Sequence, residues 1–310
     1  MTFSYEVKTE LCHLKIPSKI QALMELTAFA GLNAAVALNQ EGLKLRFFSE
    51  HPEVARRITS LLNLLYGIRP EMIAQQGGGI QVNPLYLTEL GGPAMDRFIE
   101  ESGFSLMGDE REEPKNILAR LSNPENAKAY LRGAFLAAGS LVDPDKSYHL
   151  EFLIARKNQV PLFAHVAEVQ QLPFKRTLRK TDTLFYLKNS EAISDFLVDI
   201  GAPQAMLLLE DIKAKKEMKN IINRQANADT ANYDKQMEAS ARQIRAIDQL
   251  AKKPGLDQLP PPLRDLAILR LQRPEASIKE LGEALRPPLG KSGTNHRMKK
   301  LLQMAEEWRN

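Results

Sequence analysis

Two stretches of the sequence, Leu23-Met-Glu-Leu-Thr-Ala-Phe-Ala-Gly31 and Leu131-Arg-Gly-Ala-Phe-Leu-Ala-Ala-Gly139, decide the fold. The spacing of their apolar residues predicts a helix in each case, and the glycine is expected to end it. A helix that ends in Ala-Gly carries no bulk along one edge, so two such helices can pack with their backbones close together. We therefore expect this pair of helices to form the interface between two halves of one domain.

The same order of helices and strands surrounds both stretches. Apolar periodicity predicts helix–strand–strand–helix–strand–strand–helix in residues 1–110 and again in residues 120–205. A short sequence similarity between the two halves supports a duplication, because Leu45-Arg-Phe47 matches Leu150-Glu-Phe152. Chance similarity of two α+β stretches is less favoured, since so many elements share one order. The predicted fold class is α+β: a duplicated αββαββα domain with a saddle-shaped sheet surface, followed by an all-α domain.

Residues 206–253 are expected to form a helical linker, because no Pro or Gly interrupts them. The linker carries polar residues on one helix face, at the spacing i, i+3, i+4 and i+7: Asn220, Asn223, Arg224 and Asn227. Since Asn is a poor helix former, this face needs an explanation. It either makes hydrogen bonds that fix helix packing, or it contacts DNA phosphates or a protein partner. Asp229 or Thr230 could cap a second helix, which predicts a break near residues 227–232.

Residues 254–310 are expected to form a helix–turn–helix domain. Its helices are predicted at Leu263–Leu271, Ala276–Leu285 and Thr294–Trp308. Ser277 is placed to cap the second helix, with Glu280 at the capping-box position. Three short helices with a turn between the second and third match the helix–turn–helix module, in which the third helix enters the major groove of DNA.

The third of these helices has an unusual distribution of charge. Residues 286–300 contain several bases and no acid, whereas Glu306 and Glu307 fall at the other end. The helix dipole disfavours lysine and arginine side chains near a helix N-terminus. A solvated basic helix end is therefore the weaker explanation of this charge distribution, and phosphate binding is the stronger one. Within the helix–turn–helix Ala276–Arg309, the predicted DNA-binding residues are Lys291, Ser292, Thr294, Asn295, His296, Arg297, Lys299 and Lys300.

The composition excludes several other classes of protein. The single cysteine, Cys12, excludes a disulfide framework and an iron–sulfur cluster, and the five histidines are scattered. No apolar run is long enough to span a membrane, and the N-terminus has no signal-peptide pattern. The net charge of +4 permits a nucleic-acid partner. We therefore predict a cytoplasmic, nucleoid-associated protein with double-stranded DNA as its partner, no metal, no cofactor, no small-molecule ligand and no membrane contact.

Long stretches of the chain resemble the WhiA family of Gram-positive bacterial regulators: LRGAFLAAGSLVDPDKSYHLEF (131–152), NRQANADTANYDKQ (223–236) and RPEASIKELGEALRPPLGKSGTNHRMKKL (273–301). The resemblance runs nearly end to end. It implies a degenerate homing-endonuclease domain joined to a C-terminal helix–turn–helix. It also implies transcription regulation in sporulation, cell division and chromosome segregation. The chain departs from many members at Ala228, where they have Cys.

The duplicated domain is similar to single-chain LAGLIDADG homing endonucleases. In those nucleases, the acid just before the final glycine of each central helix binds the catalytic divalent ions. Ala30 and Ala138 stand at these positions here, and an alanine cannot hold a metal ion. The resemblance therefore implies a fold without nuclease activity, so the protein is not expected to be an enzyme.

Further bases lie in the hairpin of the second repeat, where the concave sheet face of the nuclease fold runs along DNA. These secondary DNA contacts are predicted at Lys175, Arg176, Arg179 and Lys180, together with Asn223, Arg224 and Asn227. The corresponding hairpin of the first repeat, residues 72–82, carries no charge. We therefore expect residues 1–205 to bind DNA poorly and residues 220–310 to retain most of the affinity.

Two functions from different classes remain. The first is a site-specific transcription regulator, which the helix–turn–helix favours. The second is a nucleoid-associated division factor that acts through general DNA binding or through contacts with another transcription or division protein. Genome-wide mapping of bound DNA, together with transcript changes on deletion, would separate the two.

Overall fold

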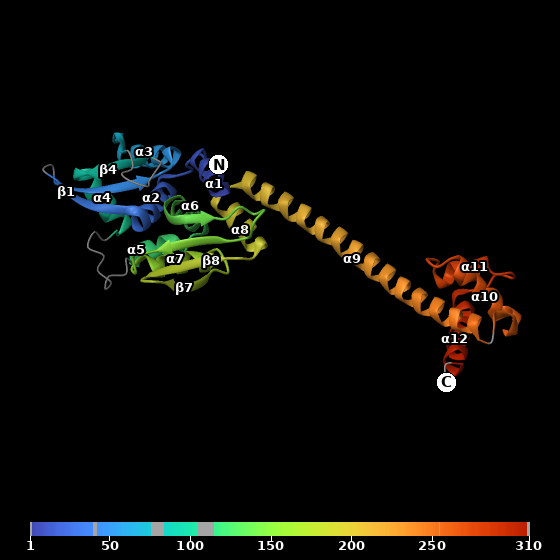
Figure 1. Cartoon of the computed structure of the whole chain (residues 1–310). Helices are drawn as coiled ribbons and strands as arrows, with labels where there is room; N and C mark the ends of the chain where they lie inside the picture. Colours follow the sequence, from blue (N-terminus) through green and yellow to red (C-terminus); the bar gives the residue numbers. More distant parts are fainter. Residues whose placement is uncertain (1, 40–41, 76–83, 105–114, 254, 309–310) are drawn as a thin grey trace. The chain divides into compact units, whose positions relative to one another are not determined.

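The computed structural model describes the chain except for residues 1, 40–41, 76–83, 105–114, 254 and 309–310, so Arg309 of the predicted helix–turn–helix lies outside it. It divides into two compact units, Met1–Lys215 and Lys216–Asn310 (Figure 1). The predicted α+β class with a C-terminal helical domain is confirmed.

The first unit is the predicted duplication. The helices and strands of the first half are α2 (Lys19–Asn33), β1 (Ala34–Asn39), β2 (Gly42–Ser49), α3 (Pro52–Tyr66), β3 (Met72–Gln75), β4 (Leu85–Gly91) and α4 (Gly92–Ser102). Those of the second half are α6 (Pro124–Ala138), β5 (Gly139–Leu141), β6 (Leu150–Ile154), α7 (Gln159–Val169), β7 (Lys175–Arg179), β8 (Asp182–Leu187) and α8 (Ser190–Ile200). Two helices were not predicted, α1 (Phe3–Cys12) and α5 (Lys115–Leu121).

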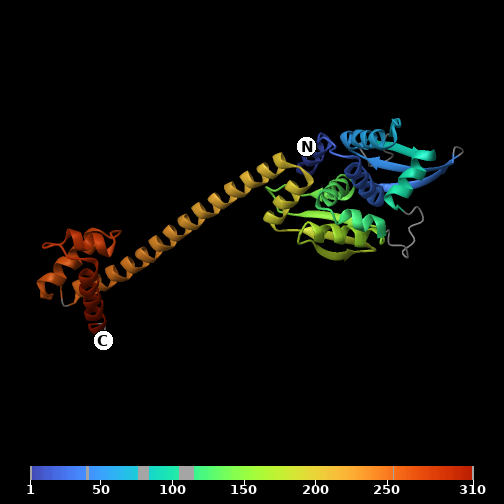
Figure 2. The ribbon, with the colours of Figure 1, turned by 180° about the vertical axis from the view of Figure 1, so that it is seen from behind.

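Each half has an antiparallel sheet of the same topology, β1-β2-β4-β3 in the first and β5-β6-β8-β7 in the second. Alternate strand residues are buried, as Leu45 and Phe47 are in β2 and Phe152 is in β6. Since strand side chains alternate between faces, one face of each sheet packs on helices and the other is left open. The open faces are where the predicted saddle surface has to lie (Figure 2).

The helices α2 and α6 pack against each other at the centre of the first unit, as predicted, but their terminal glycines do not make the closest approach. Gly31 lies inside α2, which continues to Asn33, and the backbone of Gly139 is extended. Among the glycines of the two helices, Gly133 is the one whose added Cβ would meet the other helix, 2.1 Å from the carbonyl oxygen of Glu25. The predicted packing of the two helices is confirmed. The prediction that Gly31 and Gly139 make the contact is wrong, because the glycine that faces the other helix is Gly133, in the middle of α6.

A buried charge cluster joins the two halves next to Gly133. Glu25 is 1% exposed, and its carboxylate accepts hydrogen bonds from Arg57 Nε at 2.8 Å and Arg57 Nη2 at 3.0 Å. Arg132, from α6, donates to the same carboxylate at 3.3 Å and to the carbonyl of Ile200 at 2.8 Å. Arg57 also donates to the carbonyl of Leu14. The cluster therefore connects α2, α3, α6 and the ends of two other helices.

The long helix α9 (Pro203–Lys252) begins in the first unit and ends in the second. The predicted break near residues 227–232 is wrong, because Asp229 and Thr230 lie inside a continuous helix. Its last turns contribute Ile247 and Leu250 to the core of the second unit.

Three further helices complete the second unit: α10 (Pro261–Gln272), α11 (Ile278–Ala284) and α12 (Lys291–Glu307). Leu266, Leu281 and Leu301 are fully buried between them. The predicted capping box of α11 is confirmed, with Ser277 and Glu280 hydrogen-bonded to each other's backbone N–H groups. Arg270 is also buried, and it donates to the carbonyl of Ala276 at 2.6 Å, which fixes the turn between α10 and α11.

Candidate nucleic-acid interface

The turn between α11 and α12 determines which residues of α12 are available to a ligand. Gly282 of α11 approaches this turn so closely that an added Cβ would lie 2.2 Å from the carbonyl oxygen of Leu289. The Thr294 hydroxyl donates to the carbonyl of Gly290 at 3.1 Å, and Thr294 is fully buried. The prediction that Thr294 contacts DNA is therefore wrong, because its side chain holds the turn together.

The other predicted residues of α12 are accessible. Lys291, Ser292, Asn295, His296, Lys299 and Lys300 are exposed, and Arg297 is half-buried. Thr294, Met298, Leu301 and Ala305 form the buried stripe. At 100° per residue, His296 lies directly opposite that stripe, with Gln303 and Ser292 beside it and with Lys299 and Lys300 flanking them on either side. Gln303 is exposed on this outward face and was missed, because the sequence argument stopped at the last base of the helix.

The outward face of α12 is positively charged at its N-terminal end. The first turn contains no acid, and within the described chain Lys291, Arg297, Lys299 and Lys300 form no ion pair. Lysine and arginine side chains without an ion-pair partner, close to the free backbone N–H groups of a helix N-terminus, are suited to bind the phosphates of a nucleic acid. The acids Glu306 and Glu307 lie four turns away, at the far end of the helix.

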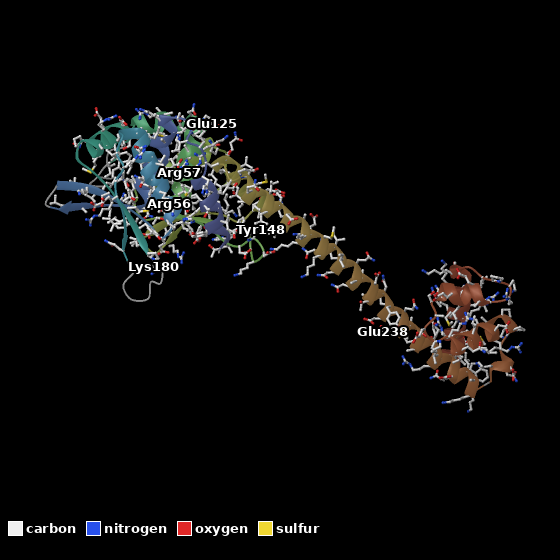
Figure 3. All side chains as sticks on the ribbon, turned by 90° about the horizontal axis from the view of Figure 1, so that it is seen from above. Arg56, Arg57, Glu125, Tyr148, Lys180 and Glu238 are labelled. Carbon is white, nitrogen blue, oxygen red and sulfur yellow. The ribbon has the colours of Figure 1, made fainter. Side chains whose placement is uncertain are left out.

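In the first unit, the predicted bases of β7 divide between two faces. All of β7 is exposed, and Lys175 pairs with Tyr186 while Arg176 pairs with the buried Phe185. Lys175 and Arg179 therefore share the open face of the sheet, while Arg176 points to the opposite face. Arg179 Nη1 lies 3.9 Å from Glu151, and Lys180 occupies the turn after β7 (Figure 3).

The open face of the first sheet also carries two cationic side chains, and both bind the same acid. Lys44 and Arg46 of β2 both bind Glu89 of β4, at 3.3 Å and 2.7 Å. Burial raises the pKa of Glu89, yet hydrogen bonds from Arg46 and Lys44 outweigh it and hold that pKa below its usual value. The uncharged hairpin alone gave no sign of these two cationic side chains. Since one carboxylate serves both cations, this group of three side chains keeps one net positive charge.

The polar face of α9 takes no part in internal packing. Asn220, Asn223, Arg224 and Asn227 are all exposed. Arg224 donates to the carbonyl of Asn220 at 3.3 Å, while Asn223 and Asn227 make no hydrogen bond to the described part of the chain. The first interpretation of this face, as hydrogen bonds that fix helix packing, is therefore wrong.

Side-chain cations cover the C-terminal ends of the two central helices. Arg156 donates to the carbonyls of Ala30 at 2.9 Å, Gly31 at 3.3 Å and Ala34. At the end of α6, Lys8 donates to the carbonyl of Leu136 at 3.3 Å. Burial lowers the pKa of Lys8 to about 8. The negative ends of both helix dipoles are thus matched by positive side chains from elsewhere in the unit.

No group of three or more His, Cys, Asp or Glu side chains suited to a metal ion occurs among the residues that the structure describes. Within the same residues, no helix has the length and hydropathy needed to cross a membrane.

Comparison with known proteins covers the whole chain. Family models match the WhiA N-terminal LAGLIDADG-like domain over residues 19–105, the WhiA LAGLIDADG-like domain over 127–219, and the WhiA C-terminal HTH domain over 222–305. These matches support the helix–turn–helix assignment of the second unit.

Curated relatives and a solved structure agree with these models. Proteins named "Probable cell division protein WhiA" from Clostridium beijerinckii and Clostridium acetobutylicum are 35% and 36% identical, each over 100% of this chain and 99% of the relative. The crystal structure of full-length DUF199/WhiA from Thermatoga maritima matches with a TM-score of 0.60 and 25% identity, over 99% of both chains. From these matches, the chain belongs to the WhiA family.

Proposed function

We propose that this protein is a DNA-binding transcription regulator that acts in cell division and chromosome segregation, and in sporulation where the organism sporulates. The observation that carries the proposal is the exposed N-terminal half of α12, whose lysine and arginine side chains have no acidic partner among the described residues. The names of the relatives support the link to cell division. Association with the nucleoid follows if its partner is double-stranded DNA.

In this proposal the residues of α12 have two roles. Ser292 and His296 lie on the outward face of the helix and reach base edges in the major groove. Lys291, Asn295, Arg297, Lys299 and Lys300 flank that face and contact phosphates, and these contacts position the helix without reading sequence. The bases of β7 and the polar face of α9 serve as weaker secondary contacts.

Replacing Lys291, Arg297 and Lys300 together by alanine is expected to weaken binding to all DNA. Each lost phosphate contact should reduce the slope of log affinity against log salt by roughly one unit. Fluorescence anisotropy titrations of the full chain at several salt concentrations measure both quantities. Replacing Arg56, Arg97 and Lys128, which are already paired with acids, removes the same formal charge and should leave the slope unchanged. A triple α12 variant with wild-type affinity and slope would refute the proposal.

His296→Ala is expected to affect specificity rather than general affinity. Its position at the centre of the outward face predicts a loss of roughly 1–3 kcal/mol on the sequence that the wild-type protein selects from a random pool, and much less on random DNA. Lys300→Ala is the matched comparison, because a phosphate contact should weaken both DNAs equally. Equal losses on both DNAs for His296→Ala would place His296 among the phosphate contacts.

We also propose that the first unit has no nuclease activity. The alanines at 30 and 138 provide no metal ligand, and Arg156 and Lys8 already supply positive charge at the ends of α2 and α6. Magnesium or manganese should therefore produce no cleavage of plasmid DNA by the purified protein. Ala30→Asp with Ala138→Asp should also remain inactive, because each new carboxylate would have the cation of Arg156 or Lys8 nearby. Metal-dependent cleavage that persists through stringent purification would contradict this proposal.

A second candidate function is a nucleoid-associated division factor that acts mainly through protein contacts. The exposed face of α9 favours it, since Asn223 and Asn227 have no hydrogen-bond partner in the described chain. Mapping of bound DNA across the genome, with transcripts compared after deletion, separates the two functions. A regulator should show discrete sites beside genes whose transcription changes, whereas the alternative predicts broad binding without such changes.

A further inference from the structure

A cavity of about 620 Å³ lies in the first unit, between its two halves and beside the C-terminal end of α6. Its walls come from α1, the last residue of α2, the segment 48–51, the first residue of β4 and the end of α6. Cavities of this size hold ligands as large as a drug molecule. Because these segments are far apart along the chain, sequence patterns gave no sign of the cavity and no small-molecule ligand was expected.

Lys8 places a positive charge in the wall of this cavity. Its ammonium group donates to the carbonyl of Leu136 at 3.3 Å and lies 5.6 Å from the centre of the Phe135 ring. Within the described residues Lys8 forms no ion pair, so N–H donors remain for a ligand. Burial lowers the pKa of Lys8 to about 8, and an anion beside it would raise that pKa again. Lys8 is therefore suited to hold an anionic group.

The wall also contains a fixed aromatic ring. The ring of Tyr5 stacks on that of His51, with the centroids 3.8 Å apart and the planes at 19°. His51 Nε2 donates to the carbonyl of Tyr5 at 3.2 Å, which helps to keep both rings in place. Phe48, Leu85 and Leu136 add apolar surface to the wall. Since aromatic side chains stack on nucleobases, the cavity suits a planar ring of this kind.

Two oxygen acceptors set a further condition on the ligand. The amide nitrogen of Asn33 donates to the carbonyls of Phe48 at 3.0 Å and Ala137 at 3.1 Å, so both of its N–H groups are used. Its Oδ1 has no hydrogen-bond donor among the described residues. The carboxylate of Glu50 lies in the same wall. Carboxylates bind the hydroxyls of a ribose, whereas they repel a ligand that is only an anion.

From these features we propose that the cavity binds a ribonucleoside monophosphate whose base carries an amino group, such as AMP or CMP. The phosphate binds Lys8, the base lies against Tyr5, and N–H and O–H groups of the base and ribose donate to Asn33 and Glu50. An inorganic anion lacks the ring and the donors, and a neutral nucleoside lacks the charge, so each should bind more weakly. The site involves no residue of α12, so it does not depend on the proposed function.

Isothermal titration calorimetry of the full chain without DNA tests this inference. At pH 7, AMP or CMP is expected to bind with a dissociation constant of roughly 10–500 µM, since the cavity is open to solvent and one ion pair forms. The matching nucleoside and inorganic phosphate should each bind at least about tenfold more weakly. The inference is overturned if neither nucleotide binds at millimolar concentration, or if inorganic phosphate binds as tightly as the nucleotide.

Lys8→Met removes the ammonium group and keeps the length of the side chain. It should reduce the affinity for the nucleotide to that for its nucleoside, a loss of at least about tenfold. Lys15→Met is the matched control, because Lys15 is exposed, carries the same charge and lies outside the cavity. It should leave the affinity unchanged. A folded Lys8→Met variant, checked by circular dichroism, with wild-type affinity for the nucleotide contradicts the inference.

The pH dependence of binding gives a readout that needs no variant. Cys12, Glu50 and His51 are the described titratable groups that face Lys8. Burial raises the pKa of Cys12 to about 12 and lowers the pKa of His51, so both stay neutral from pH 7 to pH 9. Lys8 loses its proton over this range, so the affinity for the nucleotide should fall about tenfold. Equal affinity at the two pH values would exclude Lys8 as the phosphate ligand.

Discussion

Arg57→Gln is expected to lower the free energy of unfolding of the first unit by about 3–5 kcal/mol. Arg57 and Glu25 are both almost fully buried and share two hydrogen bonds. Removing the guanidinium leaves the Glu25 carboxylate in the interior with Arg132 alone, at 3.3 Å. It also leaves the carbonyl of Leu14 without its donor. Urea denaturation followed by circular dichroism measures the loss.

The neighbouring residue provides the matched control. Arg56 is exposed and bonds to Glu53 one helical turn before it, so Arg56→Gln should change stability by no more than about 0.5 kcal/mol. Both arginines are labelled on α3 in Figure 3. Similar losses for the two variants would mean that the buried cluster contributes nothing beyond a surface ion pair.

Gly133→Ala is expected to destabilise the first unit by about 3 kcal/mol, although alanine is the better helix former. Its methyl group would lie 2.1 Å from the carbonyl oxygen of Glu25 and 2.8 Å from the carbonyl carbon. Backbone atoms in the middle of a packed helix cannot move aside, so α2 and α6 must separate. Thermal unfolding monitored by circular dichroism would report this loss as a lower melting temperature.

Gly31→Ala is the matched comparison, because it adds the same methyl group to α2 at a position that faces a side chain instead of a backbone. The new methyl group would meet the amide oxygen of Gln159, which is the end of a flexible side chain and can rotate away. We therefore expect a loss of less than about 1 kcal/mol. If Gly31→Ala were as damaging as Gly133→Ala, contact with the backbone of α2 would not be what makes the Gly133 substitution costly.

The duplicated fold could be predicted because its signals are local and occur twice. Apolar periodicity and the repeated order of elements determined the αββαββα unit, and Ser277 with Glu280 marked the start of α11. The break predicted at Asp229 did not occur, because a good capping residue inside a long helical pattern does not by itself end a helix. Capping potential is local, whereas helix continuation depends on the residues on both sides.

The candidate interface was less predictable because exposure depends on packing. Thr294 and Asn295 looked equivalent in sequence, but the hydroxyl of Thr294 bonds inside the α11–α12 turn while Asn295 is exposed. Likewise, Glu89 lies more than forty residues from Lys44 and Arg46, and only the register between β2 and β4 brings it beside them. Contacts between distant positions cannot be read from spacing along the chain.

Each half of the first unit contributes side chains that bind the central helix of the other half, and this has a consequence for how the two halves could be separated. Lys8, although it belongs in sequence to the first half, binds the end of α6 in the second, and Ser4 accepts a hydrogen bond from Leu141. Arg156 of the second half binds the end of α2 in the first. Each half thus supplies a cation to the C-terminal end of the central helix of the other half. We therefore expect a gene split between the repeats to yield two fragments that depend on each other for these contacts, rather than two autonomous subunits.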